Sequence, residues 1–191
     1  MNRSIGIPPE ECVEPSSVDI VITSPLYGDS RTTVAYGQYS RLSAAWLGLG
    51  EPAKVDNRLM GGRKQKSIPK YPCEALNTAI AKIAAKDEKR SYDVVAFYSD
   101  YLSSIRNVAE TVKRGGYACY VVANRRVKGV TLPTDKATET FFAEQGFDHI
   151  DTYRREIPNK RMPLRNSPTN EPGKVDKTMR NEFIVVMRKE F

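Results

Sequence analysis

The sequence predicts a single α/β domain that spans residues 1–191 and contains a mostly parallel sheet. Short hydrophobic segments rich in β-branched residues alternate along the chain with segments of helical periodicity, which is the pattern of an α/β layer architecture. The chain also has the length of one ordinary domain, and its 40% hydrophobic and 28% charged residues are typical of a globular protein.

The first predicted strand covers residues 18–23 and ends before Ser24 and Pro25. Its nearly continuous apolar character predicts a strand buried on both faces, as in a parallel sheet. Residues 28–71 then form an inserted loop, because this stretch is too long for a plain connection between a strand and a helix. A short helix is expected within it over residues 42–47, followed by a basic run over residues 61–66.

Apolar residues at helical spacing predict three further helices, over residues 72–86, 92–113 and 135–145. The second is the longest, and we expect Gly115 to end it. Lys113 and Arg114 would then lie at its C-terminal end, where the helix dipole favours cations.

Three more strands are predicted over residues 117–123, 147–157 and 182–188. No helix is predicted between the last two strands, so we expect them to pair antiparallel at one edge of the sheet. The segment between them, residues 158–180, is a basic loop rich in proline.

Composition limits the classes of function. The net charge of +7 and the pI of about 9.3 fit a polyanionic partner such as nucleic acid, although many basic proteins bind none. The three cysteines are widely separated and odd in number, which argues against a disulfide framework, and the single histidine argues against a His-rich metal site. No apolar run has membrane-spanning length and no signal peptide is recognised, so we expect a cytoplasmic protein without a metal.

The segment most indicative of chemistry is Thr23 to Tyr27, directly after the first strand. Ligands of open α/β sheets bind beyond the carboxyl ends of the strands. The Ser24 hydroxyl and the Pro25 carbonyl can accept hydrogen bonds from an exocyclic amino group, and Tyr27 can stack on a base, so together they could receive an extruded nucleobase. Taken alone, these residues also fit an ordinary Ser-Pro turn with a packed tyrosine.

Residues 19–30 resemble the catalytic-loop region of site-specific DNA methyltransferases that act on exocyclic amines. That family has Asp, Asn or Ser followed by two prolines and an aromatic residue, and serine is most typical of the cytosine-N4 enzymes. Residues 31–42, 122–125 and 160–170 are also similar to that subgroup. The resemblance implies a partial Rossmann-like, class I methyltransferase fold that contains the C-terminal half of the sheet.

The resemblance also implies roles for the loop. Ser24 and the Pro25 carbonyl would hold the target amine, and Tyr27 would stack on a flipped cytosine. The methyl donor would be S-adenosylmethionine, and the product would be N4-methylcytosine in double-stranded DNA, as in a restriction-modification system. Adenine-N6 methylation is the first alternative, and a non-catalytic DNA-binding or partner module is the second.

Basic and aromatic residues in the inserted loop and in the basic loop are candidates for contacting DNA, although a merely solvated charged surface is an alternative. Arginine and glutamine can hydrogen-bond to base edges, and tyrosine can stack on bases. Asp29 could handle a proton at the amine or orient the loop. The candidate nucleic-acid-binding residues are Arg31, Tyr36, Gln38, Tyr39, Arg41, Arg63, Lys64, Lys160, Arg161 and Arg165.

Two features depart from the family pattern. Leu26 replaces the second proline, and no glycine-rich cofactor loop follows a predicted strand. The 17 residues before the first strand are too few for the missing strand and helix units. The cofactor site is therefore not identified, and we expect a separate polypeptide or an N-terminal portion to supply it. A half-sheet would expose an apolar strand edge and favour association.

Overall fold

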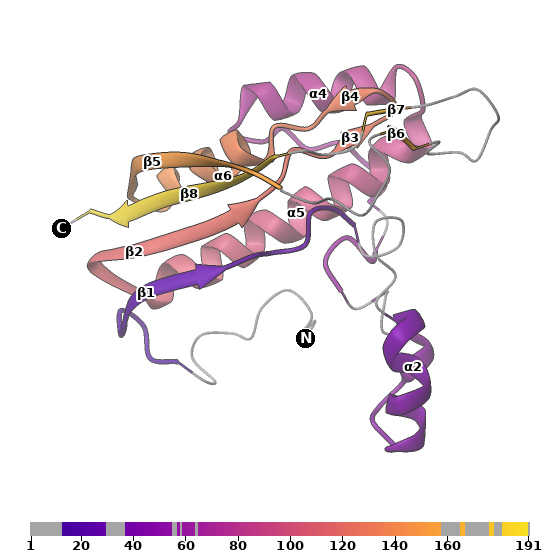
Figure 1. Ribbon diagram of the computed structural model, residues 1–191, viewed down its shortest axis with the longest axis horizontal. Coiled ribbons are helices and arrows are strands. Elements are labelled where there is room, and N and C mark those ends of the chain that lie inside the picture. Colours follow the sequence, from indigo (N-terminus) through magenta and orange to yellow (C-terminus); the bar gives the residue numbers. More distant parts are fainter. Residues whose placement is uncertain are drawn as a thin grey trace.

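The computed structural model describes residues 13–29, 37–54, 57, 59–63, 65–157, 165–166, 176–177 and 181–190. Its central element is a four-stranded sheet with helices packed against one face (Figure 1). The α/β class predicted from the sequence is confirmed.

The sheet contains, in spatial order, β1 (Val18–Thr23), β2 (Val112–Val122), β8 (Asn181–Lys189) and β5 (Phe147–Glu156). β1 and β2 pair parallel, whereas β8 pairs antiparallel with both β2 and β5. Three of the four strands therefore run in one direction. The predicted antiparallel pairing of the last two long strands is confirmed, with β5 at the edge and β8 between β5 and β2.

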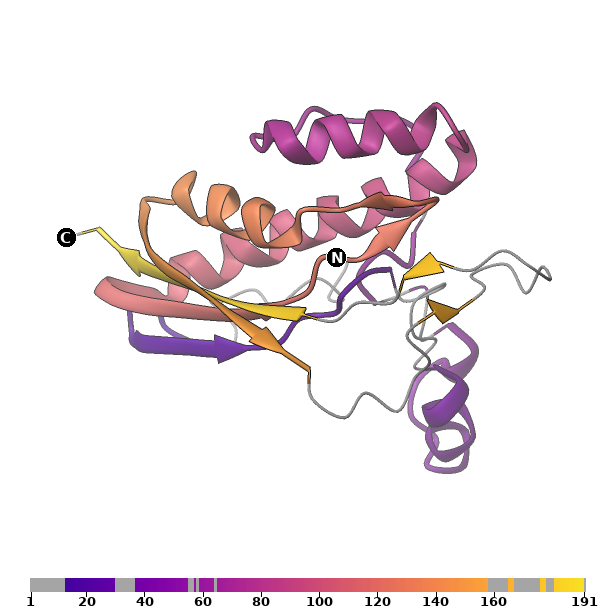
Figure 2. The same cartoon turned by 45° about the horizontal axis from the view of Figure 1, so that its top comes forward.

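Helices α4 (Glu74–Ala84), α5 (Glu88–Thr111) and α6 (Thr134–Ala143) lie on the same face of the sheet (Figure 2). Their apolar side chains and those of one sheet face form the hydrophobic core. The hydroxyls of Tyr98 and Tyr101 on α5 lie 2.9 Å and 2.7 Å from those of Thr134 and Thr138 on α6. These hydrogen bonds satisfy buried polar groups and fix α6 against α5.

The ends of α5 differ from the prediction. The helix begins at Glu88, four residues earlier than predicted, because the Asp87 side chain caps it by accepting a hydrogen bond from the Arg90 N–H at 3.0 Å. It also ends sooner, at Thr111, so Lys113 and Arg114 lie in β2 and not in a last helical turn. Gly115, with φ of +75°, lies where the register between β1 and β2 shifts, so this glycine serves an irregularity in a strand and not a helix end.

The second face of the sheet is not covered by any helix that the structure describes. Ile20 and Ile22 of β1 are 50% and 71% exposed there, next to Tyr117 of β2 in the ladder. The prediction that β1 is buried on both faces is wrong, because no helix of the described part of the chain covers this face (Figure 2). β1 is also an edge strand, with β2 as its partner among the described strands.

The inserted loop contains α2 (Gly37–Trp46), which includes most of the short helix predicted over residues 42–47, and the 3-10 helix η1 (Pro52–Lys54). α2 extends away from the sheet (Figure 1). Two small hairpins were not predicted: β3 (Arg126–Val127) with β4 (Val130–Thr131), and β6 (Arg165–Asn166) with β7 (Asp176–Lys177). None of the helices in the described residues is both long and apolar enough to span a membrane.

Candidate active site

The loop from Ser24 to Tyr27 directly follows β1, at the edge of the sheet where the parallel strands β1 and β2 both end. Ser24 is exposed, and Pro25 and Tyr27 are partly buried. Leu26 packs against the hydrophobic core. The leucine that replaces a proline therefore anchors the loop through an apolar contact, while its neighbour Ser24 is left accessible.

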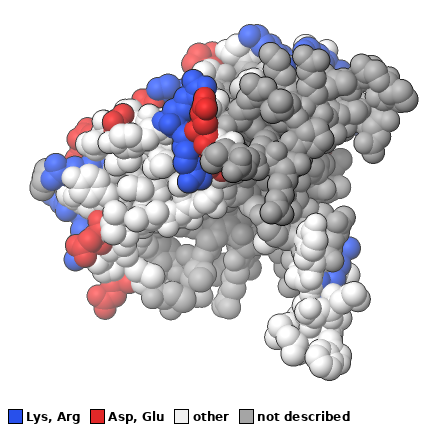
Figure 3. Space-filling model, in the orientation of Figure 1, with Lys and Arg blue, Asp and Glu red and all other residues white. Residues whose placement is uncertain are grey.

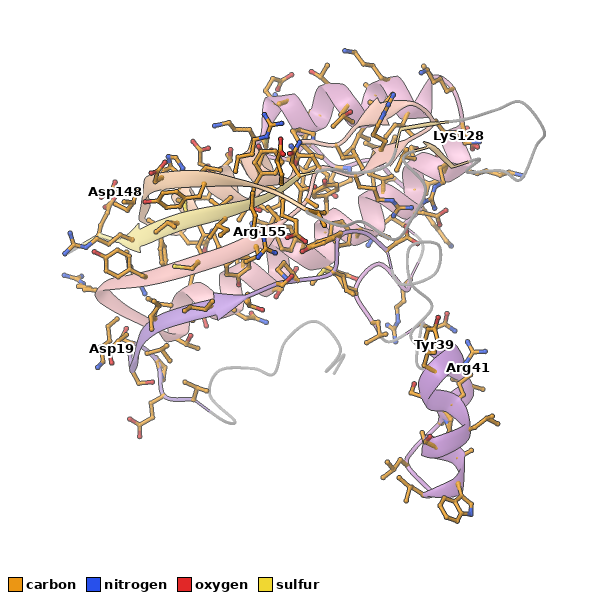
Figure 4. The ribbon with its side chains drawn as sticks, in the orientation of Figure 1. Asp19, Tyr39, Arg41, Lys128, Asp148 and Arg155 are labelled. Atoms are coloured by element: carbon orange, nitrogen blue, oxygen red, sulfur yellow. The ribbon has the colours of Figure 1, made fainter. Side chains whose placement is uncertain are left out.

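Tyr27 connects the loop to β8 and β5, the two strands beyond β2, at the same end of the sheet. Its hydroxyl donates a hydrogen bond to Glu182 Oε1 at 2.9 Å and lies 3.2 Å from Ser24 Oγ. The second oxygen of Glu182 forms an ion pair with Arg155, which lies opposite Glu182 in the ladder of β5 and β8. Figure 4 shows Arg155 at the end of the sheet where this loop lies. Four side chains from three strand ends thus form one hydrogen-bonded row.

The electrostatics of this row define its protonation. Burial raises the pKa of Tyr27, so its hydroxyl keeps its proton at neutral pH. The hydrogen bond from Arg155 lowers the pKa of Glu182, so this group is a carboxylate. Sequence analysis missed Glu182 and Arg155 because they are 155 and 128 residues from Tyr27 along the chain and carry no local motif.

Asp29, two residues after Tyr27, anchors the loop to the interior of the protein through two ion pairs. It is 1% exposed, and its Oδ2 lies 3.3 Å from Arg90 Nη2 on α5 and 3.2 Å from Arg125 Nη1 after β2. Arg90 also pairs with Asp93 at 3.0 Å. Burial lowers the pKa of the Arg125 guanidinium, and the positive charge of nearby Arg90 lowers it further. Because both arginines engage the Asp29 carboxylate in the interior, the geometry favours the loop-orienting role over proton handling.

The inserted loop comes back into contact with Asp29 at Gly61. Its N–H donates to Asp100 Oδ2 at 2.8 Å, and its φ is +73°. A Cβ atom at this position would lie 2.7 Å from the Cβ of Asp29. Gly61 therefore permits a contact between two backbones that no larger residue allows without a shift.

The structure does not bring together all predicted DNA contacts. Tyr39, which is 80% exposed, and Arg41 lie on α2, away from the sheet (Figure 4). Arg63 is exposed beyond Gly61, near Asp100. Gln38 and Arg165 lie in α2 and β6, but their side chains are outside the described set. Outside the described residues altogether lie Arg31, Tyr36, Lys64, Lys160 and Arg161.

Charged side chains are unevenly distributed on the visible face. Figure 3 shows Lys and Arg side chains gathered beside acidic ones on part of that face, next to atoms drawn in grey, whereas much of the remaining described surface is uncharged. Within the described residues, no cluster of His, Cys, Asp and Glu could hold a metal ion.

Comparisons with known proteins give one close relationship. The type II methyltransferase M.MvaI of Kocuria varians is 42% identical over 199 residues, which cover 98% of this chain and 44% of the relative. The chain thus spans less than half the length of this curated relative. No family model matches the chain.

Among solved structures, two crystal structures of TTHA0409 from Thermus thermophilus, provisionally assigned as a DNA modification methylase, are similar to the chain. The selenomethionine form is 16% identical with a TM-score of 0.45, and the complex with S-adenosyl-L-methionine is 17% identical with a TM-score of 0.47. Both matches cover 95% of this chain, and they cover 48% and 51% of the two crystallised chains.

Proposed function

From the 42% identity to the type II methyltransferase M.MvaI over 98% of this chain, we propose that the chain forms the target-binding half of such an enzyme. The observation that carries the proposal is the loop Ser24-Pro25-Leu26-Tyr27, which leaves a serine hydroxyl accessible at the carboxyl end of β1. The half would receive a base extruded from double-stranded DNA and orient its exocyclic amine for methylation.

The proposed target is the N4 amine of cytosine, with the N6 amine of adenine as the second candidate. The Ser24 hydroxyl and the Pro25 carbonyl accept hydrogen bonds from the amine and stabilise the positive charge that develops on its nitrogen. The Tyr27 ring, held by its hydroxyl, stacks on the base. Serine at position 24 supports cytosine, because it is the residue most typical of the cytosine-N4 subgroup that the loop resembles.

The proposed methyl donor is S-adenosylmethionine, but the described residues do not form a cradle for it. Such a cradle needs a glycine-rich turn directly after a parallel strand. Gly48 follows α2, Gly115 and Gly116 lie within β2, and Gly146 follows α6. We therefore propose that the donor site lies on a segment outside the described residues, consistent with the larger part of M.MvaI that lies beyond the matched 44%.

We propose that this segment adds to the sheet at β1. The strand is at an edge of the described sheet, and its exposed Ile20 and Ile22 continue into an open apolar face. Exposed edges and apolar faces of this kind are costly in water and pair readily with another strand. A partner that supplies a strand beside β1 and covers the open face would complete the α/β architecture.

The Ile20→Lys variant should fold but bind the partner at least about tenfold more weakly, because it places a charge in the proposed interface. The assay is calorimetric titration with the part of M.MvaI that lies outside the matched segment. The matched control is Ile150→Lys on β5, since Ile150 is 52% exposed and Ile20 is 50% exposed, but at opposite edges of the sheet. Equal effects of both substitutions would contradict an interface at β1.

The DNA-binding part of the proposal assigns phosphate and base contacts to the basic residues of the inserted loop and the basic loop. The net charge of +7 supports a polyanionic ligand. Arg41 and Arg63 are the described arginines of this set whose side chains are exposed. A cytoplasmic location, where cellular DNA is accessible, belongs to the same proposal.

The decisive experiment measures methyl transfer to unmethylated duplex DNA by the chain combined with the remaining part of M.MvaI. Radiolabelled S-adenosylmethionine supplies the methyl group, and mass spectrometry of the digested nucleosides identifies the product. N4-methylcytosine is expected, and Ser24→Ala should lower the rate at least about tenfold. N6-methyladenine would establish the second candidate. DNA binding without any transfer would establish a non-catalytic module.

A further inference from the structure

The row formed by Ser24, Tyr27, Glu182 and Arg155 determines the direction of each of its hydrogen bonds. A carboxylate can only accept, so the proton of the Tyr27 hydroxyl points to Glu182 Oε1, 2.9 Å away. That proton is then not available to Ser24. The 3.2 Å contact between the two hydroxyls must therefore use the proton of Ser24, with Tyr27 as its acceptor.

This direction has a consequence for the exposed side of Ser24. A hydroxyl has one proton and two lone pairs. When its proton is directed to Tyr27, Ser24 Oγ presents only lone pairs to a ligand at the sheet edge. It can then accept a hydrogen bond from an amino group but cannot donate one to a carbonyl oxygen.

We propose that Glu182 is a positioning residue that acts through Tyr27 to fix Ser24 as a hydrogen-bond acceptor for the target amine. The inference rests on the proposed function, and it adds a basis for discrimination to it. Cytosine and adenine carry exocyclic amines, whereas thymine and guanine carry carbonyl oxygens at the corresponding positions. A Ser24 hydroxyl that only accepts hydrogen bonds therefore selects cytosine and adenine over thymine and guanine.

Arg155 is the last member of the row and holds the Glu182 carboxylate in place. It binds Glu182 Oε2 and leaves Oε1 for Tyr27. The side chain of Glu182 is 13% exposed, whereas that of Arg155 is 62% exposed. The Glu182 carboxylate is thus largely shielded from solvent, which strengthens the hydrogen bonds that it accepts.

The first test follows the Tyr27 hydroxyl in the chain without DNA. Tyrosine labelled with ¹³C at Cζ reports the ionisation of each ring by NMR, and Tyr27→Phe assigns the Tyr27 signal. Glu182→Gln should lower the pKa of Tyr27, because both the acceptor and its negative charge raise it in the native chain. Glu156→Gln, the same change on the neighbouring strand β5, should leave it unchanged. An unchanged Tyr27 pKa in Glu182→Gln would overturn the proposed row.

The second test is a double-mutant cycle on methyl transfer, with the complex used for the proposed function. Tyr27→Phe and Glu182→Gln should each lower kcat about tenfold, as expected for loss of a hydrogen bond to a charged group, with DNA affinity within about twofold. Because Glu182 acts through Tyr27, the double variant should be no slower than either single variant. Additive losses would show a merely structural role for Glu182 and refute the proposal.

The two tests separate the possible failures. If the unaltered complex transfers no methyl group, the proposed function is wrong, and Ser24 then has no target amine from which to accept a hydrogen bond. The NMR result still decides whether the hydrogen-bonded row exists. If Glu182→Gln does not fold, Tyr27→Phe keeps the packed ring and carries the same kcat prediction. Glu156→Gln is the control for charge and should retain the full rate.

Discussion

Replacement of Asp29 by asparagine should lower the free energy of unfolding by about 3–5 kcal/mol, the range found when one partner of a buried ion pair is removed. Asp29 is 1% exposed and contacts Arg90 and Arg125, whose side chains are 16% and 17% exposed. Asparagine has nearly the same shape, so the loss reflects two arginines that keep their charge in the interior without this carboxylate. Urea denaturation followed by circular dichroism measures the effect.

Asp19→Asn is the matched control for this prediction. Asp19 also pairs with a cation, Lys113 Nζ at 3.0 Å, but its side chain is 81% exposed (Figure 4). Exposed pairs contribute about 0–1 kcal/mol, so the control should unfold near the midpoint of the native chain. If both variants lost a similar free energy of unfolding, burial would not be the reason that the Asp29 ion pairs stabilise the fold.

Gly61→Ala is expected to destabilise the chain by about 2–5 kcal/mol, the sum of a backbone and a packing cost. The left-handed backbone conformation costs an alanine about 1–2 kcal/mol, and forcing a new atom into a packed site costs about 1–3 kcal/mol more. The added Cβ would meet the Cβ of Asp29 at 2.7 Å and its Cα at 2.9 Å. The same urea denaturation measures the loss.

Gly129→Ala separates the two contributions. Gly129 has φ of +74°, against +73° for Gly61, but its Cβ would meet nothing within 4 Å. The control should therefore show the backbone cost of about 1–2 kcal/mol alone. If Gly61→Ala were as stable as Gly129→Ala, the close contact between Gly61 and Asp29 would carry no packing cost.

Local sequence was sufficient for the long strands, for the main helices and for the position of the loop after β1. The bounds of β1 were predicted correctly, because Ser24 and Pro25 end its β-branched run. The apolar stripe that predicted α5 is the stripe that packs in the core. Gly115 misled the prediction, since a glycine in a left-handed conformation serves a helix end and a strand irregularity equally well.

The charged parts of the site could not be predicted in this way. Asp29 is 61 residues from Arg90 and 96 from Arg125, and Glu182 is 27 residues from Arg155. The register of β5 and β8 places Glu182 opposite Arg155, and the packing of α5 near the ends of β1 and β2 brings Arg90 and Arg125 to Asp29. Charge type and spacing along the sequence carry no record of that pairing.

The error about β1 is informative in a different way. Its residues are those of a strand covered on both faces, yet Ile22 is 71% exposed. A run such as Val18 to Thr23 is suited to a parallel sheet with helices on both sides. Its sequence therefore matches a more complete sheet than the described residues form.

The antiparallel pair of β5 and β8 has one more consequence. The basic loop leaves the sheet just after Arg155 and returns just before Glu182, so the ion pair of these two residues closes the neck of that loop. This ion pair therefore ties the end of β5 to the start of β8, and the same carboxylate receives the Tyr27 hydroxyl. Loss of the Arg155 side chain would free both strand ends at the point where the Tyr27 hydroxyl is held.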